Sequence, residues 1–192
     1  MRVDISEDRP RLELELPDGL VVWVSPLTLD DRHVVEEGFD ELSQESKFSR
    51  FGLGLGHLTA SELDYLTDVD QRDHVAWGVS SVESEGMGVG RYIITGGSPC
   101  AEIALTVMDE WQGKGVGTLL LRVLGAIAKA DGVDEFCFRF VPGNEQVRKM
   151  LQGIEVQFDE TDGLMEGRMP VSVIPDSDWD HTAVELLAQF RD

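Results

Sequence analysis

Short runs in which apolar and polar residues alternate recur along the chain, and a two-residue period predicts half-buried β-strands. The first two runs, at 11–16 and 20–25, flank a Pro-Asp-Gly turn and should form a hairpin. Runs of the same kind predict strands at 74–82, 89–95, 101–108 and 134–141. The stretches EVQF (155–158) and LMEGRMPVSV (164–173) predict a closing strand pair around the turn DETDG.

Other segments show the 3.6-residue period of amphipathic helices. Thr28 and Asp31 have capping-box spacing and begin a predicted helix over 29–44, and Thr59 and Glu62 begin another. Helices are also predicted over 115–130, after the PGN turn and over 178–190. One face of the 115–130 helix carries Val116, Leu119, Leu120, Val123, Leu124 and Ile127. No linker separates two cores, so the pattern predicts one α+β domain with a mostly antiparallel sheet.

Composition narrows the function classes. The 192 residues include 37 acidic and 16 basic ones, for a formal charge of −21. Nucleic-acid backbones are excluded as partners, because binding phosphates needs clusters of Lys and Arg. An acidic surface instead attracts cationic substrates such as amines or lysine tails. No apolar run approaches the roughly 20 residues of a membrane span, and the charged N-terminus does not look like a signal peptide, so we expect a cytoplasmic protein without membrane contact.

Metal and redox chemistry find little support in the sequence. The four histidines are scattered, and no metal-ligand spacing occurs, so no metal site is predicted. Cys100 and Cys137 lie beside apolar residues and are expected to be reduced, buried thiols. The glycine-rich segment FGLGLG, at 51–56, is either a mobile lid or a plain connector.

The stretch DEWQGKGVGTLLL, from Asp109 to Leu121, places a glycine-rich loop between a strand and a helix. Backbone N–H groups at such a helix start suit phosphate groups. The P-loop pattern GxxxxGK[ST] fails, because Met108 stands where its first glycine belongs. The GxGxxG spacing of a Rossmann turn is also missing, and the loop comes after several strands. The hexamer Gln112-Gly113-Lys114-Gly115-Val116-Gly117 matches [RQ]-x-x-G-x-[GA] instead.

That hexamer resembles the acyl-CoA pyrophosphate loop of the GNAT N-acetyltransferase superfamily. SQESKFSRFG, AEIALTVMDEWQGKGVGTLLL and VPGNEQVRKML together resemble the catalytic domain of bacterial Pat-type protein lysine acetyltransferases, over roughly residues 20–170. The resemblance implies a mixed sheet flanked by helices, with an acyl-CoA cleft between two splayed central strands. It divides the chain into an N-terminal hairpin extension (1–19), a GNAT domain (20–172) and a C-terminal helical tail (173–192).

The resemblance also implies how acetyl-CoA is held. The backbones of Leu105 and Val107 would pair with the pantetheine arm, and the N–H groups from Gly113 to Thr118 would hold the pyrophosphate. The implied set is Leu105, Val107, Gln112, Gly113, Lys114, Gly115, Val116, Gly117, Thr118 and Asn144. Lys114 is equally compatible with a solvated loop lysine, and Asn144 with a helix N-cap.

Glu102 matches the family's glutamate and is the expected general base. A lysine amine with an unperturbed pKa near 10.4 is only about 0.04% neutral at pH 7, so a base that removes its proton would speed transfer. The resemblance thus implies direct attack on acetyl-CoA in a ternary complex, with a protein lysine as acceptor. Where many GNAT enzymes carry a Tyr general acid, this chain has Leu151, and LQGIEVQF departs from the family's next segment.

Two other functions stay open at this stage. The acceptor could be a small polyamine or aminoglycoside-like amine. The chain could instead be a non-catalytic acyl-CoA-binding sensor or partner-docking module, which the absence of the Tyr favours and Glu102 opposes. The tail helix is expected to pack on its own domain or on a second subunit in a homodimer.

Overall fold

The computed structural model of this protein describes residues 2–6, 9–51, 56–82, 84, 86–96 and 100–191, with the backbone alone described at 2–6, 9, 50 and 51. The predicted lid or connector at 51–56 lies, apart from its two ends, outside these residues. No helix in this part of the chain is long and apolar enough to cross a membrane.

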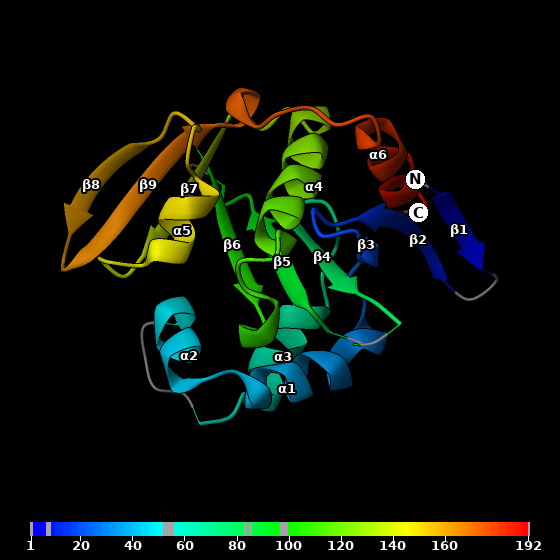
Figure 1. Cartoon of the computed structure of the whole chain (residues 1–192), viewed down its shortest axis with the longest axis horizontal. Helices are drawn as coiled ribbons and strands as arrows, with labels where there is room; N and C mark the ends of the chain where they lie inside the picture. Colours follow the sequence, from blue (N-terminus) through cyan, green and yellow to red (C-terminus); the bar gives the residue numbers. More distant parts are fainter. Residues whose placement is uncertain are drawn as a thin grey trace.

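The strands of the described residues form one nine-stranded sheet in the order β1-β2-β3-β4-β5-β6-β7-β9-β8 (Figure 1). They are β1 (Arg2–Ser6), β2 (Arg9–Glu15), β3 (Val21–Pro26), β4 (His74–Ser80), β5 (Gly88–Ile93), β6 (Ala101–Val107), β7 (Glu135–Phe140), β8 (Gln157–Thr161) and β9 (Leu164–Pro170). All neighbours are antiparallel except β6 and β7, which run parallel. The mixed, mostly antiparallel sheet is therefore confirmed.

Helices cover both faces of this sheet. They are α1 (Arg32–Glu41), α2 (Gln44–Phe51), α3 (Ala60–Thr67), α4 (Val116–Ala130), α5 (Glu145–Met150) and α6 (Asp180–Ala188), with short 3₁₀ turns at Leu29–Asp31, Asp109–Trp111 and Val171–Val173. The whole predicted apolar face of α4 is buried. It packs on β5, where a Cβ added to Gly90 would stand 2.9 Å from Leu124 and 2.7 Å from Leu105. Glycine at this position lets α4 approach the sheet closely.

The predicted 29–44 helix ends early, at Glu41, and the separate helix α2 that follows it was not predicted. The Thr28–Asp31 capping box is present, but α1 ends at Glu41 and α2 begins at Gln44. Leu42 between them has extended geometry, with φ −59° and ψ 139°. Residues 42–44 include no proline or glycine, so the sequence carries no helix-breaking residue at this boundary.

The closing strand pair is confirmed, but the turn is tighter than predicted. β8 runs to Thr161, and only Asp162 and Gly163 turn, with φ of +53° and +78°. Positive φ at both central residues is typical of the two-residue hairpin turn that Asp-Gly favours. Segment 155–156 lies outside β8, and the end of the second predicted strand, 171–173, is a 3₁₀ turn. Strand β1, in which two of the five residues are charged, was not predicted.

The prediction of reduced cysteines is also wrong. Cys100, just before β6, forms a disulfide with Cys137 of β7, and their Cα atoms are 5.8 Å apart. The pair is separated by 37 residues in sequence. The β6–β7 register makes Cys137 the neighbour of Glu102, a long-range proximity that the apolar surroundings of each cysteine could not reveal.

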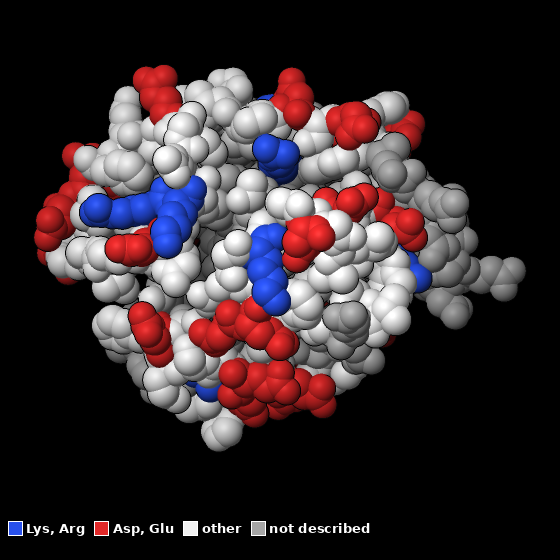
Figure 2. All heavy atoms as spheres, in the orientation of Figure 1, with Lys and Arg blue, Asp and Glu red and all other residues white. Residues whose placement is uncertain are grey.

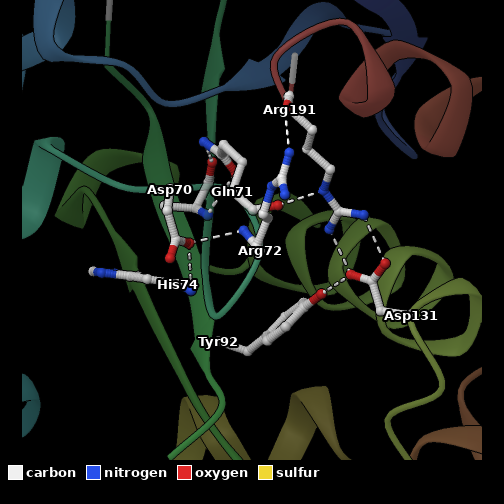
Figure 3. Close-up of polar contacts among 8 residues, drawn as sticks. Asp70, Gln71, Arg72, His74, Tyr92, Asp131 and Arg191 are labelled. Atoms are coloured by element: carbon white, nitrogen blue, oxygen red, sulfur yellow. Dashed lines mark hydrogen bonds and ion pairs between the residues drawn. The ribbon is translucent and has the colours of Figure 1, made fainter.

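The C-terminal tail packs on its own chain. Ala183, Leu186 and Leu187 of α6 are buried against α4 and the core. Beyond α6, the Arg191 guanidinium donates hydrogen bonds of 2.7 and 2.6 Å to the two carboxylate oxygens of Asp131, at the end of α4 (Figure 3). Asp131 also accepts a 2.6 Å hydrogen bond from the Tyr92 hydroxyl. A strand, a helix and the tail thus meet in one polar cluster.

Candidate active site

The two central strands separate along most of their length. β6 and β7 pair only at Ala101–Phe136 and Glu102–Cys137, whereas β6 pairs with β5 from Glu102 to Val107. Beyond Glu102, the backbone groups of β6 that face away from β5 therefore form no hydrogen-bonded ladder with β7. Such a strand edge can pair with an extended ligand, and Leu105 and Val107 lie on this separated part, as expected.

Glu102 stands where the two strands diverge. It is the exposed residue of β6. Within the described part of the chain, no hydrogen bond or ion pair engages its carboxylate. Strand alternation places it on the same face as Ala104 and Thr106, which both line a cavity under α1. The carboxylate is thus free to accept a proton from a group that arrives on the α1 side of the sheet.

The glycine-rich loop joins the other end of β6 to α4. Gly113 and Gly115 have positive φ, at +73° and +101°. A Cβ on Gly115 would also lie 2.8 Å from Pro17, so only glycine fits there. Gly115 is the N-cap of α4, and the first N–H groups of that helix have no acceptor within it. The loop and helix start therefore present the N–H groups from Gly113 to Thr118 to an anion.

The two polar side chains of the hexamer have protein partners. Gln112 Nε2 donates hydrogen bonds to the Val107 carbonyl at 3.2 Å and to Ser46 Oγ at 3.1 Å. The Lys114 ammonium lies 4.3 Å from the centre of the Trp111 ring. Gln112 thus holds the loop against β6 and α2, and Lys114 is a cation stacked beside the loop.

Asp109 begins the loop and fastens α2 to it. Its carboxylate accepts hydrogen bonds from Ser43 N–H and Ser43 Oγ, both at 2.9 Å, and from Ser46 Oγ at 2.7 Å. Partial burial by itself would raise the pKa of Asp109, but these hydrogen bonds together hold it below its ordinary value. No motif in the sequence pointed to these residues. The one available signal was the SQES stretch, where serines precede a helix.

Asn144 and Leu151 flank the short helix α5. The Asn144 side chain accepts a 3.1 Å hydrogen bond from Val147 N–H, so the N-cap role is confirmed. Leu151 is buried in the core. The two tyrosines of the chain lie elsewhere: Tyr92 donates a hydrogen bond to Asp131, with its pKa raised by burial, and the Tyr65 ring contacts the His74 ring in a tilted arrangement. Neither tyrosine therefore replaces the general acid that many GNAT enzymes have at the position of Leu151.

Basic side chains gather near the loop in an otherwise acidic protein. Figure 2 shows Lys and Arg over α5 and at the start of α4, and acidic side chains crowded around α1. Arg148 and Lys149 of α5 line a small hollow together with Gly143, Glu145 and Gln152. With Lys114 they offset the formal charge of −21 locally, which favours the approach of an anion such as a CoA nucleotide. Neither Arg148 nor Lys149 was among the residues predicted from the sequence.

The arrangement of split strands, glycine loop and amphipathic helix can be compared with known proteins. Residues 40–153, more than half of the chain, match the model of the Acetyltransferase (GNAT) family. The chain belongs to the GNAT family. Over 191 residues it is 28% identical to "Acetyltransferase Pat" of Mycolicibacterium smegmatis, a match that covers 94% of this chain and 54% of that protein.

Two further relatives support this assignment. "Acetyltransferase PA5475" of Pseudomonas aeruginosa is 30% identical over 121 residues, which is 61% of this chain and 64% of that protein. The crystal structure of the GNAT domain of S. lividans PAT superposes with a TM-score of 0.76 and 26% identity, covering 83% of this chain and 96% of the other. The GNAT chain described here is thus similar to Pat-type domains, and it spans about half to two thirds of the length of the curated relatives.

Proposed function

We propose that this GNAT chain is an acetyl-CoA-dependent N-acetyltransferase that modifies a protein lysine, with Glu102 as general base. The observation that carries the proposal is the divergence of β6 and β7 directly after Glu102, with the glycine loop at the far end of β6. These features support an arrangement in which β6 holds the thioester, with Glu102 at one end of the strand and the glycine loop at the other. Family membership and the named acetyltransferase relatives support the reaction class.

Acetyl-CoA would lie along the separated edge of β6. In this arrangement the backbones of Leu105 and Val107 pair with the pantetheine arm. The N–H groups of Gly113, Gly115 and the first turn of α4 hold the pyrophosphate, and Lys114 adds positive charge beside it. The N–H of Val107 is the proposed donor to the thioester oxygen, where negative charge develops during transfer. Asn144, which caps α5, is the remaining proposed contact to acetyl-CoA.

The chemistry requires a neutral amine next to the thioester carbon. Glu102 takes a proton from the incoming ammonium, directly or through a water molecule. The amine then attacks the carbonyl carbon and forms a tetrahedral intermediate, which collapses by breaking the carbon–sulfur bond. As the carbon–sulfur bond breaks, the nitrogen loses its second proton to solvent and the CoA thiolate takes up a proton from solvent. The products are the acetylated amine and CoA thiol, so both substrates are bound together and no acetyl-enzyme forms.

Similarity to Pat and the acidic surface around α1 favour a protein lysine as acceptor. A panel of lysine peptides, spermidine and an aminoglycoside, assayed by release of CoA thiol and corrected for hydrolysis, tests this choice. We expect release with peptides and none above background with the free amines. Release of CoA thiol with spermidine but not with the peptides would indicate that the acceptor is a small amine.

A second function is favoured by one observation, the buried Leu151 at the position where many GNAT enzymes have a Tyr acid. On this alternative the chain binds acetyl-CoA as a sensor or docking module and transfers nothing. Calorimetry with acetyl-CoA separates the two functions. Binding without thiol release, across the whole amine panel, would support the sensor and contradict the enzyme.

A further inference from the structure

A cavity of about 460 Å³ lies between α1 and the sheet, within the range of small-ligand pockets. Its floor comes from β3, β4, β5 and β6, and its roof from α1, with Leu58 and Leu66 at the side. Figure 1 shows α1 and α3 below these four strands. The cavity is separate from the glycine loop, because none of the hexamer residues lines it.

Small floor residues create this space. The strand register aligns Ser25, Gly78, Val89 and Thr106 in one row across four strands, and directly opposed residues share a face. All four line the cavity. A Cβ on Gly78 would meet only Leu27 at 3.7 Å and a backbone oxygen at 4.0 Å. The row thus lacks the bulky side chains that would normally fill the space under a helix.

The roof is apolar and only partly packed. Val34, Val35 and Gly38 of α1 line the cavity and are half-buried rather than buried. Phe39 and Leu42 complete this apolar lining. An apolar wall that keeps contact with solvent is stabilised when an apolar group covers it.

The mouth of the cavity is acidic. Asp30 and Asp31 belong to its lining, and the outer face of α1 exposes Glu36, Glu37 and Asp40. The acidic side chains around α1 in Figure 2 belong to this region. Arg11, stacked 3.7 Å over Trp23, and the buried Arg91 lie among the lining residues. The lining itself thus carries two carboxylates and two guanidinium groups, and the acidic excess comes from the outer face of α1. This excess favours a ligand that joins an apolar group to a cation lying outside the cavity.

The cavity begins beside the proposed reaction centre. Ala104 lines it and lies two residues from Glu102 on the same face of β6, about 7 Å along a strand. We propose that this cavity receives a large apolar side chain of the protein substrate, next to the lysine that is acetylated. The inference rests on the proposed function and adds to it a sequence preference: a lysine flanked by a residue such as Leu or Phe, within a basic segment.

Matched peptides test the preference. They share one length and net charge, and differ only in Leu, Phe, Ala or Asn at the positions flanking the lysine. We expect kcat/KM to be about ten- to a hundredfold higher for Leu or Phe than for Ala at one flanking position. Equal rates for all peptides would overturn the inference, as would an apolar preference shown only by free amines such as phenylethylamine.

Variants of Gly78 locate the preference in the cavity. Gly78→Leu should bring kcat/KM for the Leu-flanked peptide to within about twofold of that for the Ala-flanked peptide. Turnover of the Ala-flanked peptide and affinity for acetyl-CoA should not change. Gly78→Ala is the matched control and should keep the preference, because a Cβ fits there without a clash. Ser25→Leu fills the cavity from the next strand and serves if Gly78→Leu fails to fold. A preference that survives both filling variants would overturn the assignment.

Binding separates this inference from the proposed function. Calorimetric titration of the CoA-loaded protein with the Leu- and Ala-flanked peptides needs no turnover. Tighter binding of the Leu peptide, abolished by Gly78→Leu, would support the cavity even if no acetyl group is transferred. Equal binding would overturn the cavity assignment even if both peptides are acetylated.

Discussion

Asp109 and Ser43 connect the glycine loop to α2 across 66 positions of sequence. The Asp109 carboxylate accepts 2.9 Å hydrogen bonds from both the backbone N–H and the hydroxyl of Ser43. A carboxylate at the start of a helix also interacts favourably with the helix dipole. One side chain of the loop therefore positions the helix that follows α1 on the proposed acceptor side.

Replacing Asp109 with Asn should loosen α2. The amide keeps only one accepting oxygen and no charge, so we expect a loss of about 1 kcal/mol, a value reduced for exposure to solvent. Amide hydrogen exchange at the described part of α2 should rise, and the melting temperature should fall slightly. Glu110→Gln is the matched control, because Glu110 is exposed in the same turn. Equal exchange in the two variants would contradict the role given to Asp109.

The break between α1 and α2 shows why sequence patterns identified most elements but missed this boundary and the short helix after it. Apolar spacing located most of the strands and the long helix α4, whose buried positions follow directly from the 3.6-residue period. The break after Glu41 is stabilised by the hydrogen bonds from Ser43 to Asp109. Asp109 is distant in sequence, so local sequence patterns could not reveal this contact. The disulfide between Cys100 and Cys137 escaped prediction for the same reason, since it depends on the β6–β7 register.

The candidate site was predictable in part. The hexamer located the loop, and its glycines have the positive φ and close approach that a helix start of this kind requires. Glu102 was selected by family resemblance, and its exposure at the strand divergence is a feature of the fold. The cavity under α1 was not predicted, because it arises from a row of small residues on four separate strands.

His74 makes the stability depend on pH. Burial, followed by the nearby charge of Arg91, lowers its pKa to about 4, with Asp70 acting in the opposite direction. An unfolded histidine titrates near 6.5, so between pH 6.5 and 4 the unfolded chain binds the extra proton. Stability should fall as pH drops through this window, by roughly 1–2 kcal/mol once the partial exposure of His74 is allowed for.

Denaturant unfolding at several pH values between 4 and 7 measures this effect. His74→Gln keeps an acceptor for the Arg91 hydrogen bond, seen at 3.2 Å to His74 Nε2, but cannot titrate. The variant should show a flatter pH profile than the wild type. Identical pH profiles of the two proteins would contradict a lowered pKa of His74.

The disulfide should stabilise the end at which β6 and β7 pair. Chain-entropy arguments for a loop of 37 residues give about 4 kcal/mol as an upper value. Adding a reductant should therefore lower the melting temperature of the wild type and leave Cys137→Ser unaffected. A thiol titration of protein denatured without reductant should find no free thiols. Two free thiols there would contradict the bond.

Arg191 should stabilise the tail through its fork-like contact with Asp131. Arg191→Lys keeps the charge but loses the two parallel bonds, now 2.7 and 2.6 Å, and should cost about 1 kcal/mol in thermal unfolding. Arg148→Lys, on an exposed face of α5, is the matched control. A melting temperature unchanged by Arg191→Lys would mean that the cluster in Figure 3 contributes nothing to stability.

The most direct test of the account compares Glu102→Gln with Glu15→Gln, which alters an exposed carboxylate of β2 far from the strand divergence. CoA-thiol release with a lysine peptide and acetyl-CoA is measured for both variants, and calorimetry gives their affinity for acetyl-CoA. The account predicts that Glu102→Gln lowers turnover about a hundredfold or more at near-normal acetyl-CoA affinity, whereas Glu15→Gln behaves as wild type. Full turnover in Glu102→Gln would contradict the central claim that this carboxylate accepts the proton of the acceptor amine.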